Sequence, residues 1–497
     1  MRPSKTETII FLAAALTRLP FTSKLLYNLD SVQFALGAQK FDVTLHQPQP
    51  PGYFLYVLMG RAADMAMGDI NRAFVLVSII FSALTAVILY RLGREVFDND
   101  TGVAAAVLFI TSPLMWLHGE VALSYMPEAF MSGLFAYLCY KIIKGEHRLF
   151  WVAAVVLGVA GGIRQNTMVF LMPLWFYSMK GLGTRRVAAA LAVFAVTVLA
   201  WFIPMTVASG GFTHYYESLS AHWRDSNWRG IHLHWIEFNA TYMLYFILSG
   251  LLLALAPLIA SLYNVLRGRT VISDRGILFF FGFWLMPPFL FHLIIFTHPA
   301  VPGHSLIYMV GLLVLAARSI TCPSMPLKRP RWAFVAIVAS VNTLFFLFAP
   351  YPLSAKGIRE HDKALAGYIK TIRENFSPAD TEIIGTDRFL YSYRHAMFYL
   401  PEFRVHDTVF LSTPDGPRLF LGQNDTTTKT RWITPLPSTR NFIDFINYGP
   451  GYRGDYTPEA RLVPAGDGDF LVVYSNIGEL GRVARLAPFI DPAVKKP

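Results

Sequence analysis

Long apolar runs alternate with short polar segments over the first 350 residues of the chain. A helix that spans a membrane needs about 20 mostly apolar residues. Eleven runs approach this requirement, at 7–26, 71–90, 101–118, 121–140, 149–163, 167–179, 187–207, 241–266, 276–297, 303–318 and 333–350. The pattern predicts a polytopic α-helical membrane protein with about 11 transmembrane helices, in which 149–163 and 167–179 are the shortest pair and can also be interpreted as one broken helix.

The distribution of Lys and Arg predicts the orientation of these helices, because cytoplasmic loops carry an excess of both residues. With the N-terminus inside, seventeen Lys and Arg fall on inside segments, and the outside segments before residue 351 hold far fewer. Merging 149–163 with 167–179 would invert the loops on one side and spoil this asymmetry. We therefore predict a multi-pass protein of the plasma or inner membrane, with a cytoplasmic N-terminus and an extracytoplasmic C-terminus.

The same topology predicts two domains. Residues 1–350 form a transmembrane module with long outer loops at 27–70 and 208–240. Residues 351–497 form an extracytoplasmic tail that is charged, rich in Pro and Thr, and without a spanning run. Two strands and one helix are predicted in this tail, at 381–386, 469–474 and 387–400. These elements indicate a small α/β domain.

Composition excludes several classes of protein. The chain is 54% hydrophobic and only 15% charged, whereas a soluble domain carries about 25% charged residues. It therefore has too few charged residues to cover the surfaces of two or three soluble domains. Two cysteines exclude a disulfide scaffold. The net charge of +11 is no evidence for nucleic acid, because the excess lies on the inside segments. No nucleotide-binding glycine motif and no metal-site spacing occur, so we expect no cofactor and no metal.

Charged and polar groups gather at the outer ends of the predicted helices, where they can share one outward-facing cavity. Charges at membrane depth are costly, so they usually have a partner or a function. The candidate catalytic residues are Asp30 and Glu128, and the candidate substrate-binding residues are Lys40, His46, Glu120, Tyr125, Arg164 and His304.

Each of these residues also has a structural interpretation. Asp30 is a candidate general base or an N-cap of a helix that starts at 31. Glu128 and Glu120 are candidate site carboxylates, and Glu128 also suits the first turn of a helix. His46, which precedes a Pro-rich stretch, is more often structural than a ligand.

Arg164 and the histidines of the second outer loop leave further alternatives open. The forked donors of Arg164 suit a phosphate, and an ion pair with one of the carboxylates is the alternative. His214, His222, His232 and His234 lack the spacing of a zinc site. Tryptophans near them favour a loop at the membrane interface.

An ordered set of motifs resembles the dolichyl-phosphate-mannose-protein mannosyltransferase superfamily, with the lipid A aminoarabinose transferases as relatives. The motifs are Pro50-Pro51-Gly-Tyr53, Asn71-Arg72-Ala73, Leu89-Tyr-Arg-Leu-Gly-Arg-Glu-Val-Phe97, Thr111-Ser-Pro113 and Tyr125-Met-Pro-Glu128. The resemblance covers about residues 1–320 and is weaker in the tail, at Ala396-Met-Phe-Tyr-Leu-Pro-Glu402. It implies the GT-C fold of glycosyltransferases that use polyprenyl-phosphate sugars.

The resemblance also implies roles for residues. The catalytic carboxylate of the family falls on Asp30, but Ser31 stands where many members have a second acid. The second acidic position falls on Glu128, and Arg164 occupies a position that is often basic. Pro302-Gly-His304 is a loose match to a late outer segment of the family.

The activity implied is transfer of a sugar, a hexose or a pentose, from a polyprenyl- or dolichyl-phosphate carrier to a glycan, lipid or protein acceptor. The transfer would take place on the extracytoplasmic side of the membrane, with inversion at the anomeric carbon. The lipid-linked donor is a substrate, and the implied partners include membrane lipid. Two alternatives are a transporter or lipid flippase, which predicts internal repeats that the sequence lacks, and a non-catalytic scaffold with a partner-binding tail.

Overall fold

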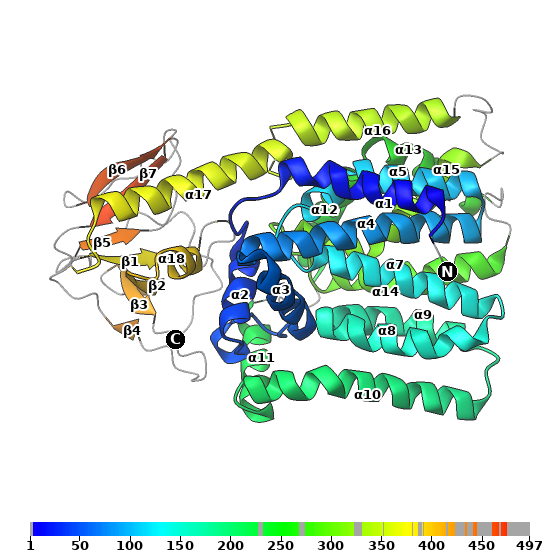
Figure 1. Ribbon diagram of the computed structural model, residues 1–497, viewed down its shortest axis with the longest axis horizontal. Helices are drawn as coiled ribbons and strands as arrows, with labels where there is room; N and C mark the ends of the chain where they lie inside the picture. The colour runs from blue at the N-terminus through cyan, green and yellow to red at the C-terminus, as the bar shows by residue number, and fades with distance from the viewer. Residues whose placement is uncertain are drawn as a thin grey trace. The chain divides into compact units, whose positions relative to one another are not determined.

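The computed structural model describes residues 3–226, 232–267, 274–322, 331–350, 352–379, 381–385, 390, 392–413, 416–422, 433–434, 441–444, 460–466 and 469–474. The chain forms two compact units (Figure 1). The first unit consists of residues 1–23 and 50–358, and the second of residues 24–49 and 359–497. The first outer loop is therefore divided, and its first half belongs with the tail. The predicted domains 1–350 and 351–497 stay a prediction.

The regular elements among the described residues of the first unit are all helices or 3-10 turns. Its helices are α1 (Lys5–Arg18), α3 (Phe54–Met67), α4 (Ile70–Val96), α5 (Asn99–Thr111), α6 (Pro113–His118), α7 (Tyr125–Ile143), α8 (Phe150–Ile163), α9 (Gln165–Ser178), α10 (Thr184–Ala208), α11 (Phe212–Ser226), α12 (Leu233–Leu251), α13 (Leu255–Leu266), α14 (Arg275–Ile294), α15 (Leu306–Thr321) and α16 (Arg331–Phe348). Short 3-10 turns lie at η1 (Leu19–Phe21), η3 (His147–Leu149), η4 (Leu252–Ala254) and η5 (Pro302–Ser305).

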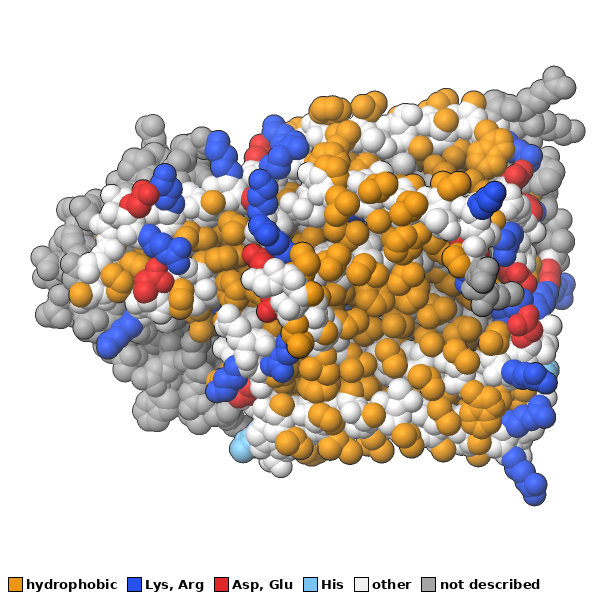
Figure 2. All heavy atoms as spheres, viewed as in Figure 1, with side chains coloured by type: hydrophobic (Ala, Val, Ile, Leu, Met, Phe, Trp, Pro, Cys, Tyr) orange, Lys and Arg blue, Asp and Glu red, His pale blue; other side chains and the backbone are white. Residues whose placement is uncertain are grey.

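Among the described residues, six helical segments are long and apolar enough to cross a membrane. Figure 2 shows apolar side chains over most of the visible face of these helices, with Lys, Arg, Asp and Glu gathered toward both ends of the apolar surface. An apolar belt between polar ends is what a bilayer requires of a protein that spans it. The chain is a multi-pass membrane protein.

Polar residues at the helix starts fix several of these boundaries. The Ser4 hydroxyl accepts from the Glu7 amide at 3.2 Å, and the Glu7 carboxylate accepts from the Ser4 amide at 2.9 Å, which makes a capping box. Asp69 and Asp98 cap α4 and α5 by accepting from backbone amides three residues on. The predicted run 101–118 is broken after Thr111, because a proline at 113 restricts the residue before it.

The short pair of predicted spans is confirmed as two helices. Helices α8 and α9 pack against each other and are separated by Arg164, whose backbone is extended (φ −148°, ψ 115°). The predicted run 241–266 differs more from the structure. Its helix starts earlier, at Leu233, and is interrupted at Leu252, whose φ is 44°. Such a positive φ cannot continue a right-handed helix.

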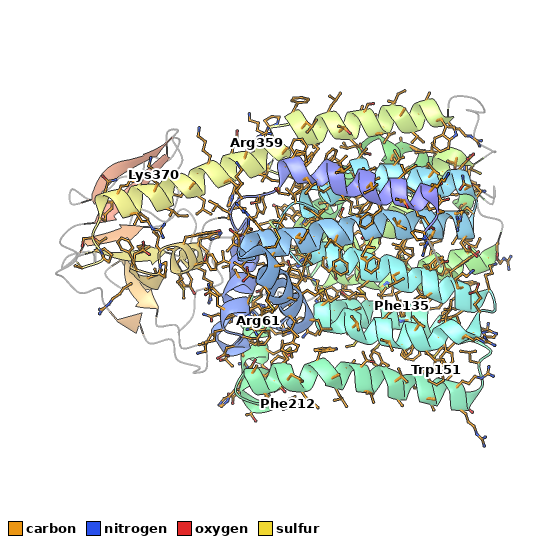
Figure 3. The ribbon with its side chains drawn as sticks, viewed as in Figure 1. Arg61, Phe135, Trp151, Phe212, Arg359 and Lys370 are labelled. Atoms are coloured by element: carbon orange, nitrogen blue, oxygen red, sulfur yellow. The ribbon has the colours of Figure 1, made fainter. Side chains whose placement is uncertain are left out.

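Small residues let the central helices approach closely. A Cβ on Gly102 of α5 would lie 2.5 Å from the Tyr90 carbonyl oxygen of α4. Close backbone contact of this kind replaces the hydrophobic effect between helices in lipid. Large side chains of these helices differ in burial: Phe135 of α7 is fully buried, whereas Trp151 of α8 is 39% exposed. Figure 3 labels both residues.

We predict that Gly102→Ala destabilises the first unit by about 1–3 kcal/mol, because the added methyl must push α4 and α5 apart. Gly282→Ala in α14 is the matched control, since nothing lies within 4 Å of its added Cβ. The control should unfold at or slightly above the wild-type temperature, because alanine favours a helix over glycine. Thermal unfolding in detergent measures both, and equal effects would contradict the packing of α4 on α5.

The second unit combines the loop helix α2 (Leu29–Gln39) and the turn η2 (Val43–Leu45) with tail elements. The tail contributes α17 (Ala355–Asn375), α18 (Tyr393–Tyr399) and strands β1 (Thr381–Gly385), β2 (Arg404–Thr413), β3 (Gly416–Gly422), β4 (Ile433–Thr434), β5 (Asn441–Asp444), β6 (Ala460–Gly466) and β7 (Asp469–Tyr474). The strand order is β4-β3-β2-β1-β5-β7-β6. Strand β1 is parallel to β2 and β5, and the other pairs are antiparallel.

An apolar cluster joins the tail helices to the sheet. Buried members come from α17, β1 and α18 and from the segment that follows α18: Leu365, Tyr368, Ile372, Ile383, Ala396, Leu400 and Phe403. The strands predicted at 381–386 and 469–474 are confirmed at Thr381–Gly385 and Asp469–Tyr474. The helix predicted over 387–400 is confirmed only at Tyr393–Tyr399, and residues 386–389 and 391 lie outside the described residues. Sequence reasoning missed α17, although Leu365, Tyr368 and Ile372 have helical spacing.

Candidate functional site

A buried ion pair lies at the start of α7 and α9. Arg164 Nε is 3.1 Å from Glu128 Oε2, and the two side chains are only 6% and 3% exposed. Glu128 Oε1 also accepts a hydrogen bond from Thr167 Oγ1 at 2.8 Å. Arg164 Nη1 donates to Ser124 Oγ at 3.1 Å. The ion pair, which was one of the two alternatives for Arg164, is therefore present in the structure.

Two tyrosine rings flank the Arg164 guanidinium. Its central carbon lies 4.6 Å from the centre of the Tyr125 ring and 5.2 Å from that of Tyr53. Tyr53 adopts a left-handed backbone (φ 45°), which is rare for a bulky residue and costs about 1–3 kcal/mol. That conformation ends the Pro-rich segment and starts α3. The aromatic faces attract the cation and hold it in one orientation.

Two histidine rings also contact the ring of Tyr125. Its ring meets His118 of α6 at 5.3 Å and His304 of η5 at 5.7 Å between centroids. His304 in turn stacks on His292 of α14 at 5.9 Å. Gly303 is required beside them, because a Cβ at that position would clash with the Tyr125 ring.

Glu120 lies apart from this cluster in its contacts. Its side chain is fully buried and interacts electrostatically with Arg18, which is also fully buried at the end of α1. Arg18 Nη1 donates to the Ile110 carbonyl oxygen at 2.6 Å, and its guanidinium lies 5.0 Å from the Trp116 ring centre. The contacts of Arg18 with Ile110 and Trp116 join the end of α1 to α5 and α6.

Asp30 lies in the first turn of α2, in the second unit. The N-cap of that helix is Asn28, whose side-chain oxygen accepts from the Ser31 amide at 3.0 Å and from the Ser31 hydroxyl at 3.1 Å. The alternative that Asp30 caps a helix starting at 31 is therefore wrong. The positive end of the helix dipole stabilises a carboxylate in the first turn, and Asp30 is half-buried there.

Lys40 and His46 also belong to the second unit. Lys40 ends α2 and is exposed. His46 is half-buried, with a left-handed backbone (φ 54°), and ends the turn η2 that Asp42 caps through the Thr44 amide at 2.9 Å. The structure thus assigns His46 to a tight turn.

The structure brings Tyr125, Glu128, Arg164 and His304 into one cluster within the first unit. Five residues that are not among the eight candidates complete it: Tyr53, His118, Ser124, Thr167 and His292. Tyr53 and Ser124 lie inside or beside the motifs quoted above, whereas Thr167 gave no signal beyond its position three residues after Arg164. Within the part of the chain that the structure describes, no three His, Cys, Asp or Glu side chains are grouped so as to hold a metal ion.

Comparison with known proteins identifies the fold. Residues 52–207 match the family described as dolichyl-phosphate-mannose-protein mannosyltransferase. A crystal structure of ArnT from Cupriavidus metallidurans bound to undecaprenyl phosphate superposes with a TM-score of 0.59 at 13% identity, covering 96% of this chain and 99% of that one. The chain has the GT-C fold.

The apo form of the same ArnT gives the same result, with a TM-score of 0.59 and 13% identity over 94% of this chain and 97% of that one. A comparison with curated sequences finds no significant match. The family match begins at Gly52 and spans the motifs from Tyr53 to Arg164. The resemblance to GT-C glycosyltransferases inferred from the sequence is therefore confirmed.

We predict that Glu128→Leu destabilises the first unit by about 3–5 kcal/mol, because it leaves the Arg164 charge buried without its partner. The double variant Glu128→Leu/Arg164→Met should recover most of this loss, since both charges are then absent. Thermal unfolding of the single and double variants measures the difference. Additive losses in the double variant would show that the pair is not a coupled unit.

Proposed function

We propose that this protein is a membrane glycosyltransferase that moves a sugar from a polyprenyl-phosphate carrier to an acceptor. The observation that supports this most is the full-length likeness to ArnT, a protein whose structure holds undecaprenyl phosphate. The mannosyltransferase family match over residues 52–207 supports the same class of donor. The cluster around Arg164 adds a fixed cation of the kind that a lipid phosphate needs.

In this proposal the reaction takes place on the extracytoplasmic side. The excess of Lys and Arg on the inside segments supports a cytoplasmic N-terminus and an extracytoplasmic C-terminus. The apolar tail of the donor occupies the bilayer, and its phosphate and sugar lie at the outer membrane surface. No nucleotide sugar is required there.

The chemistry is a single displacement with Asp30 as general base. Asp30 takes the proton from an acceptor hydroxyl or amine, whose oxygen or nitrogen forms a bond to the anomeric carbon. The bond from that carbon to the phosphate oxygen breaks, and the electron pair leaves with the polyprenyl phosphate. Attack from the face opposite the phosphate inverts the anomeric configuration.

Arg164 is our candidate for stabilising the leaving phosphate, with Lys40 next. The contacts with Glu128, Ser124 and the tyrosine rings orient its guanidinium before any substrate binds, so no reorganisation is needed as charge develops. Glu128 offsets part of the positive charge. We assign Glu128 to holding Arg164 in place, and Tyr125 and His304 to the wall beside it.

Glu120 and His46 keep substrate-binding roles only as predictions. The sugar and the acceptor are left open by the proposal, because neither the fold nor the cluster distinguishes a hexose from a pentose. A transfer assay therefore has to use a panel of donors.

We predict that Asp30→Asn lowers the rate of sugar transfer about 10²–10⁴-fold, because an amide cannot accept the acceptor proton. The assay uses protein reconstituted in vesicles with a panel of polyprenyl-phosphate sugars and measures release of polyprenyl phosphate. Asp42→Asn is the matched control. The carboxamide oxygen in that variant still accepts from the Thr44 amide, so its transfer rate should stay within a few-fold of wild type. An Asp30→Asn variant as active as wild type would disprove the catalytic assignment.

We also predict that the wild-type protein binds undecaprenyl phosphate and discriminates against undecaprenol, which has the same tail without the phosphate. Lipid pull-down from mixed vesicles measures the ratio. Arg164→Lys should reduce this discrimination, because an ammonium retains the charge but loses the forked donors. Equal retention of the two lipids by wild type would contradict a phosphate site.

A further inference from the structure

Two stretches of the chain more than 300 residues apart form the second unit together. One is the loop of residues 24–49, which carries Asp30, and the other is the tail. Helix α18 packs on α2 within this unit. The contacts that join them include hydrogen bonds between tail side chains and the loop backbone.

The best defined of these bonds involves His395, which is fully buried in α18. Its Nδ1 faces the Ser392 amide at 3.1 Å, and its Nε2 faces the Leu26 carbonyl oxygen at 3.2 Å. Burial, with the nearby His361, lowers the pKa of His395 to about 3, so the ring is neutral at neutral pH. Because Nδ1 accepts from an amide, the single N–H is on Nε2 and donates to Leu26.

Other tail residues hold the same short segment of the loop. The Leu26 amide donates to the Tyr399 hydroxyl oxygen at 2.8 Å. Asp362 of α17 accepts from the Lys24 amide at 2.8 Å and from the Leu25 amide at 3.2 Å. The backbone just before the Asn28 cap of α2 is therefore fixed at three consecutive residues.

Arg394, next to His395, holds the other end of the loop. Its side chain is buried, and its Nη1 donates to the Leu45 carbonyl oxygen at 3.3 Å and lies 3.5 Å from that of His46. Neighbouring residues of α18 thus bind the backbone on both sides of α2.

We propose that α18, through His395 and Arg394, with Tyr399 and Asp362 as further contacts, positions the loop that carries Asp30 for catalysis. This inference rests on the proposed function of Asp30 as the base. The four tail residues are positioning residues, since they act on α2 and on no substrate. The tail is then a part of the transferase site, whatever else it binds.

The physical reason is the precision that proton transfer demands. A displacement of about 1 Å in a reacting group can cost 10²-fold in rate. The loop of residues 24–49 contains one short helix, and a site on a loop is held less precisely than a site on the rigid elements of a scaffold. A helix on a separate folded core, whose buried cluster includes Ala396 and Leu400, supplies the rigid support.

The test compares two substitutions that imitate different halves of the histidine. In His395→Gln, the amide nitrogen reaches the place of Nε2 and still donates to Leu26. In His395→Asn, the shorter amide reaches only the place of Nδ1, and the bond to Leu26 is lost. We expect kcat for sugar transfer to fall about 10- to 100-fold in His395→Asn with little change in KM for the donor, and to stay within about threefold in His395→Gln.

A second readout does not depend on activity. Hydrogen–deuterium exchange of the peptide that covers residues 24–31 should accelerate in His395→Asn and stay near wild type in His395→Gln. Tyr399→Phe tests the neighbouring bond if His395→Asn does not fold, and it should accelerate exchange of the same peptide. Glu374→Gln is the control, because it removes the charge from the exposed pair with Lys370 at 3.9 Å in α17 and leaves the hydrogen bonds to residues 24–26 in place.

The outcomes separate the two proposals. A wild-type protein without transfer activity would overturn the proposed function, while the exchange data would still report whether α18 holds the loop. An active wild type, an inactive Asp30→Asn and a fully active His395→Asn would overturn only the positioning role. Equal loss in the Gln and Asn variants would also overturn it, because the Leu26 bond would then be irrelevant.

Discussion

The cost of burying charge is the constraint on which much of the described membrane unit depends. Arg164 and Glu128 are nearly inaccessible to water, and so are Arg18 and Glu120. An isolated ion at such depth costs several kcal/mol, so each pair ties together the helix ends that contribute its members. The pair Arg164–Glu128 joins the starts of α7 and α9, and the ring of Tyr53 brings the start of α3 to the same point.

This arrangement connects stability with the chemistry that we propose. A guanidinium fixed by a carboxylate, a hydroxyl and two rings is already oriented when a phosphate arrives. Glu128 also offsets the positive charge of Arg164. In our proposal, phosphate binding therefore depends on the orientation of the guanidinium more than on attraction at long range. The proposed base is supported in a different way, because Asp30 lies on a loop whose backbone the tail holds at both ends.

Much of the fold was predictable because its signals are local. A spanning helix needs a run of apolar residues, and a strand needs a short β-rich run, so the pair 149–163 and 167–179 and two of the described tail strands, β1 and β7, were found from the sequence. The errors arose where local rules compete. Asp30 is a preferred cap residue, but Asn28 takes that place, and the helix at Leu233 begins within what looked like a loop.

The sequence by itself determined that the chain spans a membrane and that its motifs follow the order of GT-C transferases. Those properties are read along the chain. Only the tertiary structure decided that Arg164 pairs with Glu128, and that His395 and Arg394 hold residues 26 and 45. Partners distant in sequence leave no local pattern, because a hydrogen bond depends on where the folded backbone places two atoms and not on the spacing between them.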